Sequence, residues 1–337
     1  MKQVKFFIGI DVSKEWLDMC IIVGGILLHH QQIANKSAII RRWIRQTQKQ
    51  FGYSMTDSLF SMEFTGLYTH HLLEVFHSLD AAVWLIPGLQ ISGSDGLQRG
   101  KSDKQDAVRI AEYAMSHPKK VRLWKKPRKV LEELQALLMM REKLQCTKHQ
   151  YETTMKEYKG YSSDVEYQVV KDYTTAILKI TLKQLKQIEK QIEQVIKGDE
   201  KLNELNGYIT SVDAVGLITS ANVLVTTNEF TDIAEAKKYA CYSGVAPFKD
   251  ESGKKSKRQK VSHKANKKMK RLLHLVAMSA IRMKGEMKQY YERKISAGKN
   301  KMSVLNAIRN KIILRIFACV QNKKYYEKNY VYSLAKP

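Results

Sequence analysis

The stretch VKFFIGIDVSKEWLDMCIIVGGILLHHQQIA, residues 4–34, decides the fold of the first part of the chain. Its first β-rich run, VKFFIGID, ends in Asp11, and a second run, LDMCIIV, occupies residues 17–23. The pair Gly24-Gly25 is typical of a tight hairpin turn, after which ILLHHQQIA continues as a third strand. The stretch therefore predicts three antiparallel strands, the first of which carries a carboxylate at its end.

Helix and strand patterns alternate in the sequence that follows. They predict, in order, a helix over about 37–50, a strand SLFSMEF that contains Glu63, a helix over 68–79 and a strand AAVWLIP. Residues 88–100 are rich in Gly and Ser and predict a mobile loop, and Ser102 is expected to cap a helix over 103–116. The order βββαβαβα predicts an α/β domain over residues 1–125, with a mixed sheet and flanking helices.

The composition changes between Lys129 and Lys197, where Gly160 is the only glycine and proline is absent. Leucine and isoleucine recur there at spacings of three and four residues, which predicts two long amphipathic helices. We expect an antiparallel or intermolecular coiled coil that connects two domains, over residues 126–203. A helical hairpin packed on its own domain is the alternative.

A mostly helical third domain is expected over residues 204–337. The segment SVDAVGLITSANVLVTT resembles a helix-hairpin-helix, a motif that grips phosphates through main-chain N–H groups. Asp213 and Ala214 occupy the hairpin positions where Pro and Gly are usual. Further helical patterns lie at about 234–242, 264–284 and 302–319.

The charge of the chain points to a polyanionic partner. The formal net charge is +25, while 44% of the residues are hydrophobic, so the chain is folded and strongly basic. Ten basic residues and no acid lie between positions 254 and 271, and we expect them to bind nucleic acid. They are Lys254, Lys255, Lys257, Arg258, Lys260, Lys264, Lys267, Lys268, Lys270 and Arg271.

Four acids stand at the ends of predicted elements. Asp11 ends the first strand, Glu63 ends the fourth, and Asp103 and Asp106 lie on one side of the following helix because they are three residues apart. Carboxylates that converge at a sheet edge suit two Mg²⁺ or Mn²⁺ ions about 4 Å apart, which activate the attacking oxygen and stabilise the leaving one. The acids therefore predict a metal-dependent catalytic site.

The motifs around these acids resemble those of the DEDD-type insertion-sequence transposases of the IS110 family. FIGIDVSKEWLD, SMEFTGLY and GKSDKQDAVRIAEYA resemble its three acidic signatures, and in the second half YSGVAPFKDESGKK and KANKKMKRLLHLVAMSA resemble its A-G-L-A-P…S-G segment and final conserved helix. Ser252 falls on the S-G serine of the family. Departures are Ser243 for a usual Ala, Ala265 for a usual Gly, and the altered hairpin at Asp213-Ala214.

The resemblance implies a RuvC-like (RNase H-like) first domain and a second domain whose serine, Ser252 here, links covalently to DNA. It implies a recombinase that pairs donor and target DNA through a structured non-coding guide RNA, the bridge RNA. Such proteins act as oligomers, here a dimer or tetramer through the coiled coil, with the acidic metal site of another subunit near the serine. In this interpretation, the chain moves an insertion sequence by cutting and rejoining DNA strands.

Two other functions remain open from the sequence. A RuvC-like nuclease that resolves junctions without rejoining needs the four acids but has no use for Ser252. A non-catalytic RNA-binding protein needs only the basic surface. The longest apolar stretch near the start, Leu17 to Leu28, is interrupted by Asp18 and the glycine pair, so we expect a cytoplasmic, bacterial-type protein without a membrane partner, associated with the nucleoid when active.

Overall fold

The computed structural model describes residues 4–91, 103–252, 255–261 and 265–327, with the backbone alone for 248–252 and 255–261. The chain divides into two compact units, residues 1–126 and 127–337.

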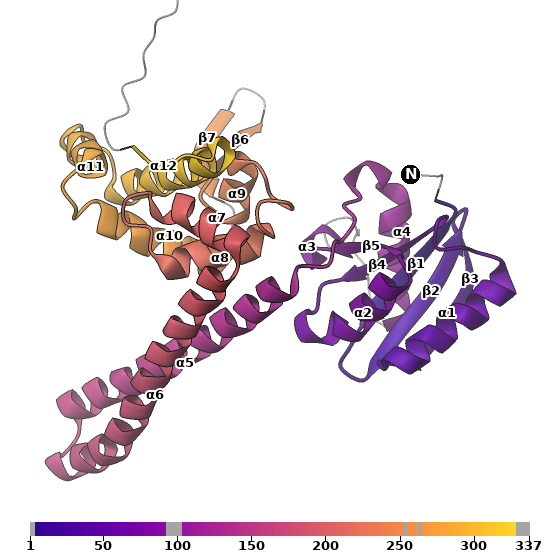
Figure 1. Ribbon diagram of the computed structural model, residues 1–337, viewed down its shortest axis with the longest axis horizontal. Coiled ribbons are helices and arrows are strands. Elements are labelled where there is room, and N and C mark those ends of the chain that lie inside the picture. Colours follow the sequence, from indigo (N-terminus) through magenta and orange to yellow (C-terminus); the bar gives the residue numbers. More distant parts are fainter. Residues whose placement is uncertain (1–3, 92–102, 253–254, 262–264, 328–337) are drawn as a thin grey trace, which may run out of the picture. The chain divides into compact units, whose positions relative to one another are not determined.

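The first unit is built on a five-stranded mixed sheet of order β3-β2-β1-β4-β5 (Figure 1). Strand β1 pairs antiparallel with β2, which pairs antiparallel with β3, whereas β4 and β5 run parallel to β1. The strands are β1 (Phe6–Val12), β2 (Trp16–Val23), β3 (Ile26–Ala34), β4 (Ser58–Glu63) and β5 (Ala82–Ile86). This is the RNase H-like arrangement, and the five predicted strands and their mixed sheet are confirmed.

Alternating side chains give the sheet two apolar faces. Ile8 and Ile10 of β1 pack with the helices α1 (Ser37–Phe51) and α2 (His70–Ser78) in one core. On the opposite face Cys20 of β2 packs against α4 (Asp103–Ser116), which lies on β1 and β2. Because neighbouring residues of a strand point to opposite faces, both cores are built from the same strands.

Local turn chemistry accounts for the first hairpin. Gly24 and Gly25 have φ angles of +56° and +87°, the conformation of a tight hairpin turn that glycine adopts without strain. A short helix, α3 (Gly88–Ile91), begins where the sequence predicts a loop, so that part of the loop prediction is wrong. The rest of the predicted loop and Ser102, the predicted cap, lie outside the described residues.

The second unit opens with two long helices, α5 (Lys129–Tyr161) and α6 (Asp164–Gly198), which lie side by side as a hairpin (Figure 1). Ser163 caps α6 in a reciprocal capping box with Glu166. Leu134 of α5 and Ile192 of α6 are fully buried in the core of this unit. The base of the hairpin therefore packs on its own unit, as in the alternative to an antiparallel or intermolecular coiled coil.

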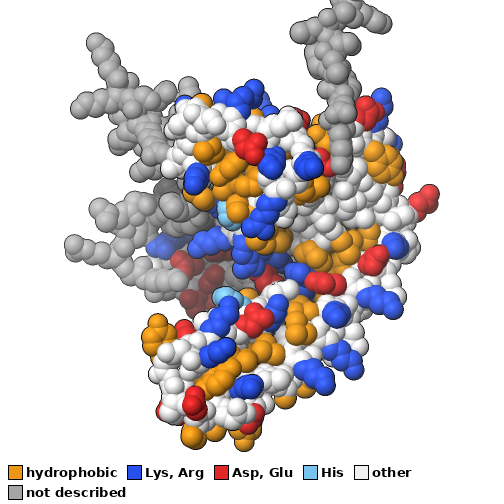
Figure 2. All heavy atoms as spheres, turned by 90° about the vertical axis from the view of Figure 1, so that its left-hand side faces the viewer, with side chains coloured by type: hydrophobic (Ala, Val, Ile, Leu, Met, Phe, Trp, Pro, Cys, Tyr) orange, Lys and Arg blue, Asp and Glu red, His pale blue; other side chains and the backbone are white. Residues whose placement is uncertain are grey.

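The outer part of this hairpin exposes apolar side chains. Tyr161, Val165 and Tyr173 are 94%, 75% and 76% exposed. Figure 2 shows hydrophobic side chains interspersed with lysines and arginines on the lower part of the visible face, which α5 and α6 form. Within the single chain, nothing described covers these side chains.

The remaining helices surround one apolar core. Helix α12 contributes buried side chains to this core along most of its length. They are α7 (Glu200–Thr210), α8 (Leu217–Thr227), α9 (Ala236–Tyr242), α10 (Lys267–Ala280), α11 (Glu286–Ser296) and α12 (Lys301–Asn322). A two-stranded hairpin of β6 (Pro247–Ser252) and β7 (Lys255–Val261) connects α9 to α10. The sequence did not predict this hairpin or α11.

The turn between α7 and α8 contains one of the departures from the usual motif. Ala214 has a φ of +66°, a left-handed conformation that favours glycine, as expected from the position's usual residue.

Among the described residues, no helix is both long and apolar enough to cross a membrane.

Candidate functional site

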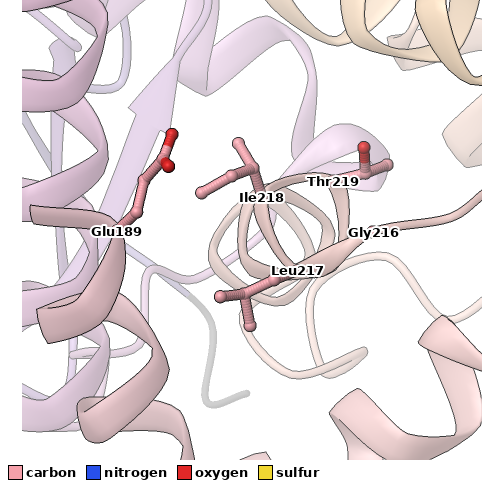
Figure 3. A pocket seen from close by; sticks show the side chains of 5 residues that line it. All are labelled: Glu189, Gly216, Leu217, Ile218 and Thr219. Carbon is pink, nitrogen blue, oxygen red and sulfur yellow. The ribbon is translucent and has the colours of Figure 1, made fainter. Parts of the chain in front are cut away.

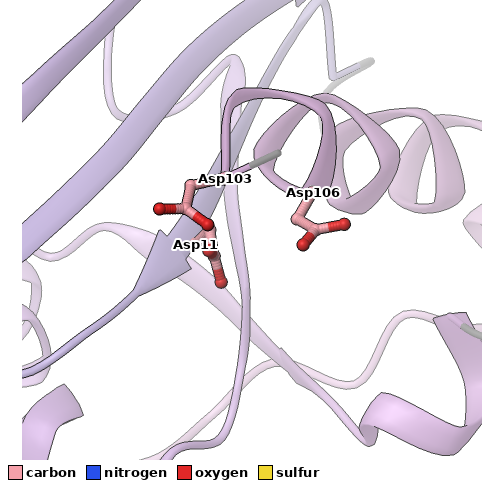
Figure 4. Close-up of side chains that lie close together, drawn as sticks. All are labelled: Asp11, Asp103 and Asp106. Carbon is pink, nitrogen blue, oxygen red and sulfur yellow. The ribbon is translucent and has the colours of Figure 1, made fainter. Parts of the chain in front are cut away.

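Three of the four predicted acids come together in the first unit. One carboxylate oxygen from each of Asp11, Asp103 and Asp106 lies within 4.8 Å of the others. Figure 4 shows the three side chains gathered between the end of β1 and the first turn of α4. Oxygen ligands at this spacing suit a hard divalent cation such as Mg²⁺.

Gly9 permits the close approach that forms this cluster. A Cβ at Gly9 would lie 2.0 Å from the backbone oxygen of Ala107 and 2.9 Å from the Cβ of Ala111, so α4 rests directly on β1. Asp11 follows two residues later on the same face of the strand. Asp103 and Asp106 precede Ala107 on α4, which brings them over the end of β1.

The cluster is electrostatically strained without a cation. Burial, followed by the charges of Asp106 and Asp103, raises the pKa of Asp11 to about 6. Arg109 relieves part of this repulsion because its Nη1 donates to Asp106 Oδ1 at 2.9 Å. A bound divalent cation would offset the remaining repulsion, so the residues present fit a metal site.

The fourth predicted acid, Glu63, stands near this cluster in the sheet but is not one of the three grouped acids. It ends β4, one register position beyond the pair Ile10–Met62, at the same edge as Asp11. Its exposed carboxylate lies over Gly88, where a Cβ would come within 1.9 Å of Glu63 Oε1. Gly88 therefore leaves room for the carboxylate of Glu63.

Sequence reasoning missed a further acid, Asp18, which pairs directly across from Asp11 on β2. Asp18 is 6% exposed and accepts hydrogen bonds from His30 Nε2 and Gln32 Nε2, both at 2.9 Å. Its charge also contributes to the raised pKa of Asp11. The pairing follows from the β1–β2 hairpin, because its short turn at residues 13–15 sets the register that places Asp18 opposite Asp11.

The predicted serine lies in the second unit. Ser252 is the last residue of β6 and pairs with Lys255 of β7. Four of the predicted basic residues, Lys255, Lys257, Arg258 and Lys260, lie on β7. Lys254 and Lys264 lie outside the described residues, as does Gly253.

The other predicted basic residues lie on the first turns of α10. Lys268 and Arg271 pair with Glu142 of α5, at 3.0 and 2.9 Å. Within the described part of the chain, Lys267 and Lys270 have no such ion pair. On α10, Lys268 and Arg271 thus bind α5, whereas Lys267 and Lys270 are available to bind nucleic acid.

A pocket of about 250 Å³ lies elsewhere in the second unit. Figure 3 shows Glu189 of α6 facing Ile218 at the start of α8, with Leu217 beside it. Glu189 is already bonded to Arg141 at 2.8 Å, and the lining includes none of the predicted site residues. The pocket is therefore separate from the residues that the sequence singles out.

The RNase H-like sheet and the acidic group at the end of β1 define an α/β protein with a candidate site for a divalent cation. A family model of DEDD-type IS110 transposases matches residues 8–158, and the model described as "Transposase IS116/IS110/IS902 family" matches residues 206–292. The chain belongs to this IS110 transposase family.

Similar proteins agree with this assignment. The "Pilin gene-inverting protein" of Moraxella lacunata is 26% identical over 332 residues, which cover 96% of this chain and 98% of that protein. Its counterpart in Moraxella bovis is 25% identical over the same length. The "Insertion element IS110 uncharacterized 43.6 kDa protein" of Streptomyces coelicolor is 27% identical over 144 residues, which cover 43% of this chain and 35% of that protein.

Two solved structures of RuvC from Thermus thermophilus, one in complex with a Holliday junction substrate, also match. Each is 13% identical, with TM-scores of 0.27 and 0.28. The matches cover 34% and 35% of this chain and 95% and 98% of the two RuvC chains.

Proposed function

We propose that this transposase cuts and rejoins DNA strands with two sets of residues, the acids Asp11, Glu63, Asp103 and Asp106 and the nucleophile Ser252. The observation that carries the proposal is the grouping of three carboxylates from β1 and α4 within 4.8 Å. These acids come from segments far apart in the sequence, and burial together with the charges of Asp106 and Asp103 raises the pKa of Asp11 to about 6.

The acids would hold Mg²⁺ or Mn²⁺, which supplies Lewis-acid stabilisation of charge at the reacting phosphate. Asp11 is fixed by the sheet, while Asp103 and Asp106 are fixed by the first turn of one helix. Glu63 completes the set from the neighbouring strand. The role of the protein is to hold these oxygens in a rigid arrangement before DNA arrives.

Rejoining without an outside energy source favours a covalent protein–DNA link. The Oγ of Ser252 would form an ester with phosphorus as a deoxyribose oxygen leaves, and attack by a DNA hydroxyl would later release the serine. Ser252 pairs with Lys255 at the end of a hairpin that carries four cations on β7. Nearby cations can stabilise the charge that develops on the phosphate.

We further propose that the chain works with a non-coding guide RNA and as an oligomer. The net charge of +25 supports binding to more than one nucleic acid. The exposed apolar side chains of α5 and α6 support assembly with other copies of the chain. Both proposals extend the family resemblance to this chain.

The experiment is to trap the covalent link. The wild-type chain, with Mg²⁺ and the RNA transcribed beside its gene, is mixed with nicked suicide DNA substrates and analysed by denaturing gel and peptide mass spectrometry. We expect a metal-dependent adduct on Ser252 that disappears in Ser252→Ala but persists in the matched control Ser256→Ala. An adduct that persists in Ser252→Ala would refute the serine assignment.

The same experiment separates the second candidate function. A junction-resolving nuclease would cleave branched DNA in Mg²⁺ without any adduct and without joined product. That outcome would mean that the acidic site cleaves DNA and that Ser252 takes no part in the reaction.

A further inference from the structure

Arg309 of α12 is a buried cation to which no described residue supplies a counter-charge. Its side chain is in the core of the second unit, and the residue is 5% exposed. Within the part of the chain that the structure describes, its only polar contact runs from Nη2 to Nδ1 of His274, at 2.6 Å, and its Nε has no hydrogen-bond partner. Among the described residues, no carboxylate forms an ion pair with it.

This arrangement differs from that of the other buried charged side chains among the described residues. Glu229, also buried, is bonded to Arg128 and to Lys201, and Asp18 is bonded to two side chains. A buried unpaired charge destabilises the fold, and an apolar side chain of similar size would be more stable there. A residue that lowers the stability of the fold in this way is expected where its role is to bind a ligand.

His274 adds a second donor rather than a counter-charge. Arginine can only donate, so Nδ1 of His274 accepts and its proton is on Nε2. Burial and the charge of Arg309 lower the pKa of His274, which keeps the ring neutral. The pair therefore presents N–H donors and a positive charge, which is suited to an anion.

The pair lies beside the base of the β6–β7 hairpin. Asn306, one turn before Arg309 on α12, donates from Nδ2 to the backbone oxygen of Val245 at 2.7 Å. Val245 precedes β6 by two residues, and β6 ends at Ser252. On α10, Lys270 is one turn before His274 on the same side of the helix and adds a further cation.

We propose that Arg309 and His274 form a binding site for a phosphodiester group of DNA, next to the hairpin that carries Ser252. The site extends the proposed function, because it supplies the second unit with a fixed phosphate contact independent of the acids. The ligand supplies a negative charge that no described side chain provides, and the planar guanidinium offers paired N–H donors to phosphate oxygens.

The test uses the full chain and the substitution Arg309→Met, with Arg282→Met, an exposed arginine of the same unit, as control. We expect Arg309→Met to unfold at the same or a higher temperature than wild type. It should bind a short DNA duplex about tenfold or more weakly, with a slope of log affinity against log salt smaller by about 1. Arg282→Met should change neither property by as much.

A second measurement uses inorganic phosphate as the probe. Phosphate should raise the unfolding temperature of the wild type more than chloride does at equal ionic strength, and His274→Leu should reduce the difference. Unchanged DNA affinity in Arg309→Met, or no phosphate effect on the wild type, would overturn the proposal. Loss of affinity for RNA alone would overturn the assignment to DNA.

The two proposals fail separately. If the wild type forms no serine adduct but DNA affinity still depends on Arg309, the covalent mechanism fails and the phosphate site stands. If the adduct forms normally in Arg309→Met, the phosphate site fails and the covalent mechanism stands.

Discussion

At the scale of single residues, the acidic site depends on Gly9 as much as on the acids. Only glycine at position 9 lets α4 rest on β1, because a Cβ there would lie 2.0 Å from the backbone oxygen of Ala107. Sequence reasoning found Asp11, Asp103 and Asp106 because each stands at the end of an element. It overlooked Gly9 because a close contact between a strand and a distant helix leaves no local pattern.

We predict that Gly9→Ala destabilises the fold by about 1–3 kcal/mol and reduces metal-dependent DNA cleavage, because α4 must move away from β1. Urea unfolding and a cleavage assay measure the two effects. Gly160→Ala is the matched control: nothing lies within 4 Å of its added Cβ, and it should preserve or slightly increase stability. Cleavage at the wild-type level in Gly9→Ala would show that the spacing of the acids is not critical.

Asp11 should also make stability depend on pH and on metal. Its pKa is raised to about 6 in the folded chain, so the folded state binds the proton more tightly than the unfolded state. Stability therefore falls as pH rises from about 4 to about 6, by on the order of 2 kcal/mol. In chelator at pH 7, Asp11→Asn should unfold at a higher temperature than wild type, and Mg²⁺ should stabilise only the wild type. Equal stabilisation of both proteins by Mg²⁺ would place the cation elsewhere.

At the scale of elements, the second unit is held by a charged junction. Arg128, at the start of α5, binds both Asp199, which caps α7, and Glu229, which follows α8. Burial alone would raise the pKa of Glu229, but its bonds to Arg128 and Lys201 outweigh burial and lower it. Glu229 adopts a φ of +54°, so the ion pairs also hold a strained turn.

We predict that Glu229→Gln lowers the free energy of unfolding by about 2 kcal/mol, less than for a fully buried pair because Arg128 is partly exposed. Since the pKa of Glu229 is lowered, the wild-type advantage should disappear as pH falls below the usual range of a carboxyl group. Urea unfolding between pH 3 and pH 7 measures this. Glu193→Gln, which removes an exposed pair with Lys197, should have no measurable effect.

The elements themselves were predictable to the extent that their signals are local. Glycine turns and apolar periodicity predicted β1 to β5 and the helices α1, α2 and α4. The hairpin of β6 and β7 was missed because PFKDES and KSKRQKV are polar and lack the alternation of a half-buried strand. Helix α11 was missed for a similar reason, since only Met287 among its residues is buried.

At the scale of the whole molecule, charge and family define the partner. The net charge of +25 and the IS110 family assignment both indicate nucleic acid. The sequence predicted the basic block but could not show that Lys268 and Arg271 bind Glu142, because that contact joins α10 to α5 across more than a hundred residues of chain.

We predict that replacing Lys254, Lys255, Lys257 and Arg258 with Ala weakens nucleic-acid binding and flattens its salt dependence, because fewer counterions are released. Replacing Lys268 and Arg271 should instead lower thermal stability, since both hold Glu142. Titrations at several salt concentrations distinguish the two sets. An unchanged slope for the first set would mean that it does not contact nucleic acid.

The central claim is that the carboxylates at the end of β1 and the start of α4 drive DNA strand exchange. The most direct measurement is recombination between donor and target DNA by Asp11→Asn and Asp106→Asn, with DNA and RNA binding measured in parallel. We expect recombination to be lost in both variants while binding is largely retained, because Asn keeps the size of the side chain but removes the charge that a divalent cation needs. Recombination at the wild-type level in either variant would contradict the claim.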